Sequence, residues 1–411
     1  MRRIAEGLLL AIVFLLPWQT TWIYGQAFIA GEPFSFGVMN LYAIEGLIVV
    51  LLGCAAALSW RQSRRHDLRW MGLFLVYALL SATWAINTEL GIAHWIHLAM
   101  AALLFLVVAF TRIDVRRLVW AFVLGLMVPV GLGIWQVAVG SSPAVAVLGL
   151  ATRDAQTLGD AVLVVGGERL LRAYGSFPHP NIFGGYLAMG LVGAGWLWRS
   201  AKRQERRWVL LVGVLLFLGL TLSFSRSAWL GLFVLCIVLL AKRRLHAPKS
   251  LRGWLAAGKG ARLGLALMIL IAAALSPLIA SRFSSRESLE AQSVSERVEQ
   301  YGEFVDVFAD HVFVGTGLRN YTLALEQIDP GRAWWEYQPM HNTWLLVLAE
   351  LGVLGFLVLL LSLRPLMNLQ ALFLIPLGVI SLFDHYLWSL WPGLALLALS
   401  AACLLRNTTY E

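Results

Sequence analysis

Apolar residues run along this chain in blocks of about 20, separated by short stretches that hold most of its charges. Such a block is long enough to cross a bilayer as an α-helix, so each one predicts a transmembrane helix. The pattern therefore predicts an all-α polytopic membrane protein with about twelve transmembrane helices. We expect one transmembrane domain over 1–411, with helices at roughly 8–24, 38–60, 70–86, 94–111, 118–138, 181–198, 208–222, 226–241, 263–280, 341–363, 370–383 and 388–405.

Two stretches between the apolar blocks, about 139–180 and 281–340, are much longer than the others. Within the second, apolar residues recur at the helical period from Ser293 to His311, and acidic residues fall on the opposite side. This pattern predicts an amphipathic helix that lies on the membrane or against the helix bundle. Because long loops carry much of a protein's function, we expect the chemistry in these stretches. The apolar stripe comprises Val294, Val298, Tyr301, Val305 and Phe308.

Composition supports a membrane protein. Of 411 residues, 59% are hydrophobic and 13% are charged, whereas a soluble domain has roughly 25% charged residues. Many of the 18 tryptophans and 10 tyrosines lie near block ends, as in interfacial aromatic belts. The three cysteines, Cys54, Cys236 and Cys403, fall inside apolar blocks and predict no disulfide framework. The N-terminus shows no small-residue cleavage pattern, so we interpret it as an uncleaved first helix.

The net charge of +9 is explained by topology and does not require a nucleic-acid partner. With Arg2 and Arg3 in the cytoplasm, 23 of the 32 lysines and arginines fall on the cytoplasmic side and nine on the outer side. This bias predicts that both termini are cytoplasmic. All nine outer basic residues are arginines, whose planar fork suits phosphate, although chance could also produce this in an arginine-rich chain.

The first candidate constellation is the run from Arg172 to Gly184, just before an expected helix. Prolines and glycines frame Arg172 and His179 in this run. Pro180 suits the first turn of the helix, whose free backbone N–H groups form a ready anion site. The alternative is a rigid turn that only anchors the helix in the membrane.

The second constellation is Ser223-Phe224-Ser225-Arg226-Ser227, a predicted tight hairpin between two apolar helices. Arg226 should therefore lie at the membrane boundary, where an ionisable group is costly and is a functional candidate. Snorkelling of this side chain to lipid phosphate is the alternative. The neighbouring serines favour a polar pocket.

Three outer residues complete the candidate site. Arg297 flanks the apolar stripe of the amphipathic helix, so it needs an anionic partner that faces the bundle or makes a surface ion pair. His341 opens an apolar helix at the outer surface, where a neutral imidazole can accept a proton or simply hydrogen-bond. A nearby arginine would lower its pKa. Asp384 lies in a short outer turn and is expected to orient a histidine, pair with an arginine, or cap the turn.

Two other sets of polar residues lie inside apolar helices. Glu350 follows His341 by nine residues, on the opposite face of the helix, and is expected to pair with another helix. His94 and His97 share a helical face, but no third ligand stands at matching spacing. A metal or haem site is therefore possible but poorly supported, and the sequence predicts neither a metal nor a cofactor.

Four motifs in this order resemble the O-antigen ligase and polymerase superfamily of membrane glycosyltransferases. They are the R-x-x-G-x-F-x-H-P-N-x-F-G run at Arg172–Gly184, S-x-S-R at Ser223–Arg226, G-x-G at Gly315–Gly317, and His341-Asn342 followed by Glu350-Leu351-Gly352. By motif the resemblance covers roughly 170–385, and by helix pattern it covers the whole chain.

The resemblance implies a multi-pass protein of the bacterial inner membrane with its active site facing the periplasm, which makes 139–180 and 281–340 periplasmic loops. It implies transfer of a polyprenyl-pyrophosphate-linked glycan to an acceptor hydroxyl, which in the ligases belongs to a lipid A-core sugar. His341 and Arg226 would be catalytic, and Arg172, Arg226 and Arg297 would bind pyrophosphate. Supporting roles fall to His179, Asn181, Asn342 and Asp384.

The residue chemistry fits that implied reaction. Arginine forks can stabilise the charge on a leaving pyrophosphate without a metal, and His341 can act as general base. The sequence shows no pair of carboxylates of the kind that forms a covalent glycosyl-enzyme. We therefore expect one inverting displacement. An O-antigen polymerase or a protein O-oligosaccharyltransferase of the same superfamily is the nearest alternative. A lipid-linked glycan transporter or flippase is a further one, although its site should lie at mid-membrane.

Overall fold

The computed structural model describes residues 1–60, 68–246, 268–273, 275–276, 288–367 and 369–407, and it is mostly helical, at 67%. The α-helices of this part of the chain are α1 (Arg2–Leu15), α2 (Ala43–Gly53), α3 (Arg69–Leu80), α4 (Thr88–Phe110), α5 (Val115–Gly125), α6 (Met127–Val139), α7 (Pro180–Ser200), α8 (Arg203–Ser223), α9 (Arg226–His246), α13 (Ser288–Asp310), α14 (Tyr321–Ile328), α15 (Thr343–Ser362), α16 (Ile375–Ile380), α17 (Tyr386–Ser389) and α18 (Trp391–Asn407). Short 3-10 helices are η1 (Ala55–Ala57), η2 (Ser81–Thr83), η3 (Ala146–Leu148), η4 (Arg364–Leu366) and η5 (Leu369–Leu374).

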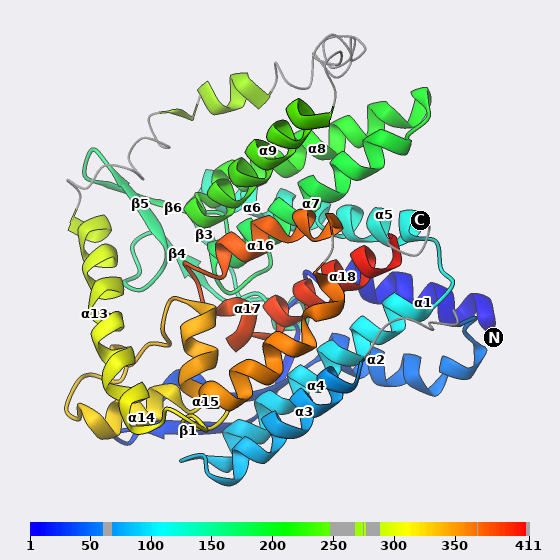
Figure 1. The fold of residues 1–411 in the computed structure, drawn as a ribbon. Coiled ribbons are helices and arrows are strands. Elements are labelled where there is room, and N and C mark those ends of the chain that lie inside the picture. The colour runs from blue at the N-terminus through cyan, green and yellow to red at the C-terminus, as the bar shows by residue number, and fades with distance from the viewer. Residues whose placement is uncertain (61–67, 247–267, 274, 277–287, 368, 408–411) are drawn as a thin grey trace.

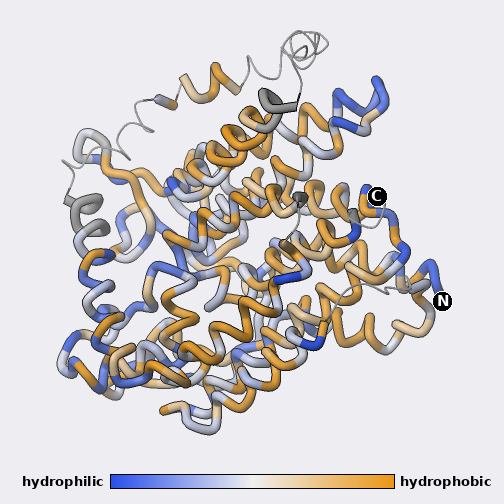
Figure 2. Tube along the Cα trace, viewed as in Figure 1, coloured by the Kyte–Doolittle hydropathy of each residue, from blue (hydrophilic) through white to orange (hydrophobic). Residues whose placement is uncertain are grey.

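Four helical stretches among the described residues are long and apolar enough to cross a membrane. They are Thr88–Phe110, Val115–Val139 (which joins α5 and α6), Arg203–Ser223 and Thr343–Leu366. Shorter apolar helices accompany them, and Figure 2 shows hydrophobic residues along the helices with hydrophilic residues concentrated toward the ends of the bundle. The count of twelve spans and their orientation stay predictions, and most of the expected helix at 263–280 falls outside the described residues.

The helices run roughly side by side as one bundle (Figure 1). Within it α4 packs on α18, α7 on α8, α9 on α16, and α15 on α3. The first turn of α1 and the last turn of α18 lie toward the right end of the view in Figure 1, whereas α13, α14, β5 and β6 lie toward the left end. The segments that carry the candidate chemistry therefore gather away from the two termini.

A long β-hairpin follows α1, which the sequence did not predict. Strand β1 (Thr21–Ile29) pairs with β2 (Glu32–Tyr42) in antiparallel fashion, and Ala30 and Gly31 both adopt positive φ at the turn, as two-residue hairpin turns require. The expected helices 8–24 and 38–60 are therefore wrong at their facing ends. The run is rich in aromatic and β-branched residues, which are apolar enough to resemble membrane helix but favour strands.

Two smaller antiparallel pairs lie in the 139–180 stretch. They are β3 (Ser141–Ser142) with β4 (Arg153–Asp154), and β5 (Val162–Val165) with β6 (Glu168–Leu171). The structure is thus mostly α-helical, with three two-stranded sheets among the described residues.

The predicted amphipathic helix is present as α13, but it presents a different face to the bundle. Gln300, Phe304 and Val307 are buried, whereas Val298 and Tyr301 of the apolar stripe are 65% and 51% exposed. The helix therefore turns a mixed polar and aromatic face inward, and this rotation brings Gln300 to the candidate site.

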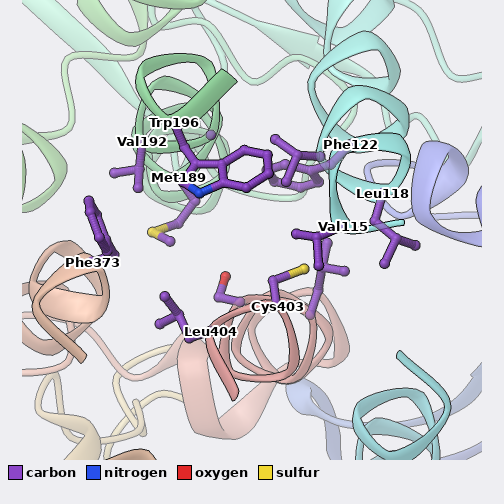
Figure 3. A pocket seen from close by; sticks show the side chains of 13 residues that line it. Val115, Leu118, Phe122, Met189, Val192, Trp196, Phe373, Cys403 and Leu404 are labelled. Atoms are coloured by element: carbon purple, nitrogen blue, oxygen red, sulfur yellow. The ribbon is translucent and has the colours of Figure 1, made fainter. Parts of the chain in front are cut away.

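An apolar cavity with an empty volume of about 650 Å³ lies between α5, α7 and α18 (Figure 3). Trp196, Phe122, Met189 and Phe373 line it, and none of its described lining residues is charged. It lies beside Val115, the first residue of α5, and Cys403, near the end of α18. Its chemistry suits apolar contact and not catalysis.

Glycine is required where the G-x-G turn meets α15. Gly352 has φ +63° inside α15, and a Cβ there would lie 2.3 Å from the carbonyl oxygen of Phe313. We expect Gly352→Ala to lower the thermal unfolding temperature, because strain of this kind costs on the order of 1–3 kcal/mol. Thermal unfolding in detergent checks this, with Gly131→Ala as control because nothing lies within 4 Å of a Cβ at that glycine. Equal loss in both variants would contradict the argument.

Candidate active site

His341 is placed by the start of α15. Asn342 caps that helix, its Oδ1 accepting hydrogen bonds from the backbone N–H groups of Trp344 (3.0 Å) and Leu345 (3.2 Å). The next residue, Thr343, donates its hydroxyl to the backbone carbonyl of Asp384 at 2.7 Å. A hydrogen bond therefore links the start of α15 to the turn that carries Asp384, although the two are about 40 positions apart in sequence.

Gln300 fixes the tautomer of His341. Its side-chain oxygen, Oε1, lies 3.0 Å from the backbone N–H of His341 and 2.9 Å from the ring nitrogen Nδ1. A backbone N–H can only donate, so the facing atom of Gln300 must be the acceptor oxygen. The same oxygen must then accept a hydrogen from Nδ1. Nδ1 is therefore protonated, and in the neutral ring Nε2 carries the lone pair that can take up a proton.

A buried arginine links the first two motifs. Arg172 is 5% exposed and donates to the carbonyl oxygens of Ser223 (3.0 Å) and Phe224 (3.3 Å). It also donates to Oδ1 of Asn181 at 2.9 Å. The Nδ2 group of Asn181 in turn donates to Asp384 at 2.9 Å. Asn181 thus connects the Arg172 guanidinium to the Asp384 carboxylate.

Arg226 and Arg297 stand near this bridge. Arg226 begins α9 immediately after the Ser223–Ser225 turn and is half-buried, as is Arg297 on the bundle side of α13. Burial, together with the Arg226 and Arg297 charges, lowers the pKa of Arg172 to about 10, although Tyr174 and Asp384 oppose the shift. Arg172 therefore stays protonated at neutral pH. The cluster holds three guanidinium groups, and the Asp384 carboxylate and that of Glu296, which acts on Arg297, partly balance them, so positive charge predominates.

Burial and charge keep the imidazole of His341 neutral. Burial lowers its pKa below the ordinary 6.5, and Arg297 acts in the same direction, while Asp384 opposes both. Burial also acts to raise the pKa of the Asp384 carboxyl, but the rings of His385, His341 and His179 and the Asn181 hydrogen bond outweigh it and hold that pKa below its usual value. The cluster thus holds a neutral base beside an ionised acid.

His179 has a local role that can be read from its contacts. It is the N-cap of α7, and its Nδ1 accepts the backbone N–H of Asn181 at 3.1 Å. This bond positions Asn181 between Arg172 and Asp384. The sequence-predicted residues therefore meet in one place, which we call the arginine–histidine cluster: Arg172, His179, Asn181, Arg226, Arg297, His341, Asn342 and Asp384.

One comparison with known proteins bears on the family. Residues 211–360 match the family model described as O-antigen ligase. The resemblance to this family is thereby confirmed over the matched segment. Three of the four motifs lie within that segment, whereas the Arg172–Gly184 run precedes it, and no curated protein matches the chain.

The family match and the apolar helices together support a membrane-embedded, glycosyltransferase-like protein of O-antigen ligase or polymerase type. The matched O-antigen ligase segment contains Arg226, Arg297 and His341. Arg172 and Asp384 join the cluster from either side of it.

Several residues around the O-antigen ligase segment were not predicted from sequence. Gln300 was missed because the apolar stripe of α13 suggested a different inward face. Arg319, with φ +61°, donates to the backbone carbonyls of Phe36 (3.1 Å) and Ser389 (2.5 Å). It ties the β-hairpin to α17, beside His385. A non-glycine residue with positive φ is a signal of constraint, but only a structure reveals it.

Two expectations about other polar residues can now be assessed. Glu350 pairs with another helix, as predicted, because Trp388 of α17 donates to it at 2.7 Å. His97 bonds Glu45 at 2.6 Å, and His94 lies 3.3 Å from the Arg319 guanidinium, a cation that would oppose metal binding there. Among the described residues there is no group of three or more potential metal ligands.

The role of Gln300 can be tested through the pH dependence of glycan transfer. Gln300→Leu removes the acceptor for Nδ1, so we expect transfer to fall by roughly 10–100-fold, as is typical when a group that orients a site residue is lost. Gln300→Glu retains an acceptor and adds a negative charge, which stabilises the imidazolium and raises the pKa of His341. As the pH is lowered, the transfer rate of Gln300→Glu should therefore begin to fall at a higher pH than the rate of wild type. A Gln300→Leu enzyme with wild-type rate and pH profile would rule out the positioning role.

Proposed function

We propose that this protein is a lipopolysaccharide O-antigen ligase of the bacterial inner membrane. It transfers a glycan from a polyprenyl-pyrophosphate donor to a sugar hydroxyl of lipid A-core on the periplasmic face. The family implies lipid-linked glycan and lipid A-core substrates in general. The observation that carries the proposal is one histidine with a fixed tautomer beside Arg297 and Asp384, in a cluster that also holds Arg172 and Arg226.

The arginines account for the leaving group. As the bond between the anomeric carbon and the phosphate oxygen breaks, its electron pair stays on the pyrophosphate, which gains negative charge. Arg172, Arg226 and Arg297 offer planar, permanently charged forks that suit phosphate oxygens. Arg172 is already held on the Ser223 and Phe224 carbonyls, so it needs little rearrangement when charge develops. These guanidinium groups supply the positive charge, so we propose a metal-independent reaction that uses no cofactor.

His341 accounts for the nucleophile. The lone pair on its Nε2 accepts the proton of the acceptor hydroxyl while the oxygen attacks the anomeric carbon. Attack and departure on opposite faces invert that carbon in a single displacement. Asp384, ionised in the cluster, then stabilises the imidazolium that forms. Proton, electron pair and glycan are all accounted for without a covalent intermediate.

The pH dependence of the reaction follows from this assignment. The general base works only when neutral, and the pKa of His341 lies below 6.5 because of burial and Arg297. We expect the rate of transfer to be constant through neutral pH and to decline only below pH 6.5, as His341 becomes protonated. A pH–rate profile measured with saturating donor checks this. A decline with its midpoint above pH 6.5 would contradict the assignment.

Two other classes of function can be distinguished from the proposal by experiment. A polymerase or a protein O-oligosaccharyltransferase of the same superfamily would use the same cluster with a different acceptor. A transporter or flippase would place its site at mid-membrane, whereas the cluster lies where α7, α9 and α15 begin. Purified protein in detergent, given lipid-linked donor and either lipid A-core or only further donor, separates these cases. Transfer to lipid A-core supports the ligase, donor elongation alone supports the polymerase, and no transfer would contradict both.

A further inference from the structure

A polar cavity lies next to the arginine–histidine cluster and is not used by the proposed mechanism. It has an empty volume of about 640 Å³, part of which is open to solvent. We call it the outer polar cavity. Its walls come from the base of the β-hairpin, the loop before β4 and the first motif, and they include Thr21, Asn40, Tyr42, Arg153, Tyr174 and Ser176.

The cavity is built by hydrogen bonds that hold its walls in place. Gln136 of α6 accepts from the backbone N–H groups of Tyr174 (3.0 Å) and Gly175 (2.9 Å) and donates to the Gly175 carbonyl at 2.9 Å. The Ser176 hydroxyl donates to the carbonyl of Pro17 at 2.6 Å. On the opposite wall Gly149 packs directly on Gln19, where a Cβ would lie 2.1 Å from backbone. The cavity is therefore preformed.

The lining is polar but nearly neutral. Arg153 is its one charged residue among those described, and Asp160 pairs with it at 2.9 Å. A phosphate would find no uncompensated cation here, and an acyl chain would meet polar lining side chains such as Gln19, Thr21 and Asn40. Hydroxyl and amide groups beside aromatic rings suit instead a ligand that carries many hydroxyls on an apolar ring frame, which is a sugar.

The cavity lies next to the arginine–histidine cluster. Tyr174 lines it and has its ring centroid 6.5 Å from that of His179. Arg153, on the same wall, stacks over Tyr174 at 4.8 Å and donates to the carbonyl of Pro178 at 3.1 Å. Pro178 directly precedes His179 of the cluster. A saccharide that enters the cavity therefore extends toward the site where pyrophosphate and acceptor hydroxyl would meet.

We propose that the outer polar cavity binds neutral sugar residues of one of the two glycan substrates, an inference that rests on the proposed glycosyl transfer. The sugars belong either to the donor glycan or to the core of the acceptor, and both present the same hydroxyl chemistry. Sugars bound in the cavity fix the direction in which the glycan chain of that substrate extends from the reacting centre.

Two substitutions test the cavity without touching the cluster. Ala151→Trp places a large ring at an exposed lining position, and Thr21→Val removes one hydroxyl at nearly constant size. We expect Ala151→Trp to raise KM for one saccharide substrate by at least about tenfold, and Thr21→Val by about two- to tenfold, the loss of one hydrogen bond. The rate at saturation should stay near wild type. Ala144→Trp and Thr157→Val, exposed and outside the cavity, are the matched controls.

Each result of these measurements either supports or overturns the proposal. A raised KM for the lipid-linked donor assigns the cavity to the donor glycan, and a raised KM for lipid A-core assigns it to the acceptor. Unchanged KM values for both overturn the proposal while leaving the ligase function intact. If wild type shows no transfer, titration calorimetry with lipid-free core oligosaccharide and lipid-free donor glycan still tests the cavity. Binding weakened by Ala151→Trp but not by Ala144→Trp supports it, and no binding of either sugar overturns it.

Discussion

Replacing His341 with alanine is expected to reduce glycan transfer by about 10²–10⁴-fold, the usual contribution of a positioned general base. The Nε2 lone pair of His341 is the proton acceptor in the proposed reaction, and the Gln300 oxygen fixes it in that state. Alanine leaves the acceptor hydroxyl without a base. The α15 cap should persist, because Asn342 and not His341 provides it. Initial rates with purified enzyme, lipid-linked donor and lipid A-core measure the effect.

His311→Ala is the matched control for this experiment. His311 follows α13 in the same outer stretch and bonds the carbonyl of Val307, so its loss removes an imidazole of similar burial outside the cluster. Its transfer rate should stay close to wild type. If His341→Ala and His311→Ala retained equal activity in equal amounts of folded protein, His341 would not be the base.

Replacing Arg226 with alanine should reduce transfer by roughly 10²–10³-fold, as loss of one preorganised group that stabilises developing charge does. Arg226 begins α9 directly after the turn on which Arg172 is anchored, and its charge reaches Arg172 and Arg297. Without Arg226, less of the negative charge that develops on the leaving pyrophosphate is neutralised. Arg226→Lys keeps the charge but loses the planar fork, so its rate should fall between those of alanine and wild type.

Arg169→Ala is the matched control, because it removes an arginine that lies outside the cluster. Arg169 lies on β6 and donates to the carbonyls of Ala155 and Thr157, away from the cluster. Its transfer rate should remain near wild type. A wild-type rate in Arg226→Ala, or an equal loss in Arg169→Ala, would show that Arg226 has no particular part in the reaction.

The sequence predicted those parts of the site that depend on local chain geometry. A tight turn between apolar blocks predicted that Arg226 lies at a helix start, and Pro180 predicted the first turn of α7. Both are observed. The expectation that an arginine keeps His341 neutral agrees with the lowering of its pKa by burial and Arg297. The catalytic roles themselves stay predictions until the variants are measured.

The contacts that the sequence did not predict join distant segments or depend on how a helix is rotated. The apolar stripe of α13 predicted that Val298 and Tyr301 would be the packed face if the helix lay on the bundle, yet Gln300 faces inward. Hydrophobicity alone missed this because the inward face must satisfy the polar His341 backbone and ring. The β-hairpin was missed because its aromatic and β-branched residues resemble membrane helix by hydropathy.

The central claim is that this protein itself moves a glycan from a pyrophosphate-linked lipid to a hydroxyl, with His341 as base. The most direct test uses labelled donor and lipid A-core with purified protein in detergent and EDTA. The amounts of glycosylated acceptor and of released polyprenyl pyrophosphate are measured together. We predict equal amounts of both from wild type and almost none from His341→Ala. Release of polyprenyl pyrophosphate without glycosylated product, or equal product from the variant, would contradict the account.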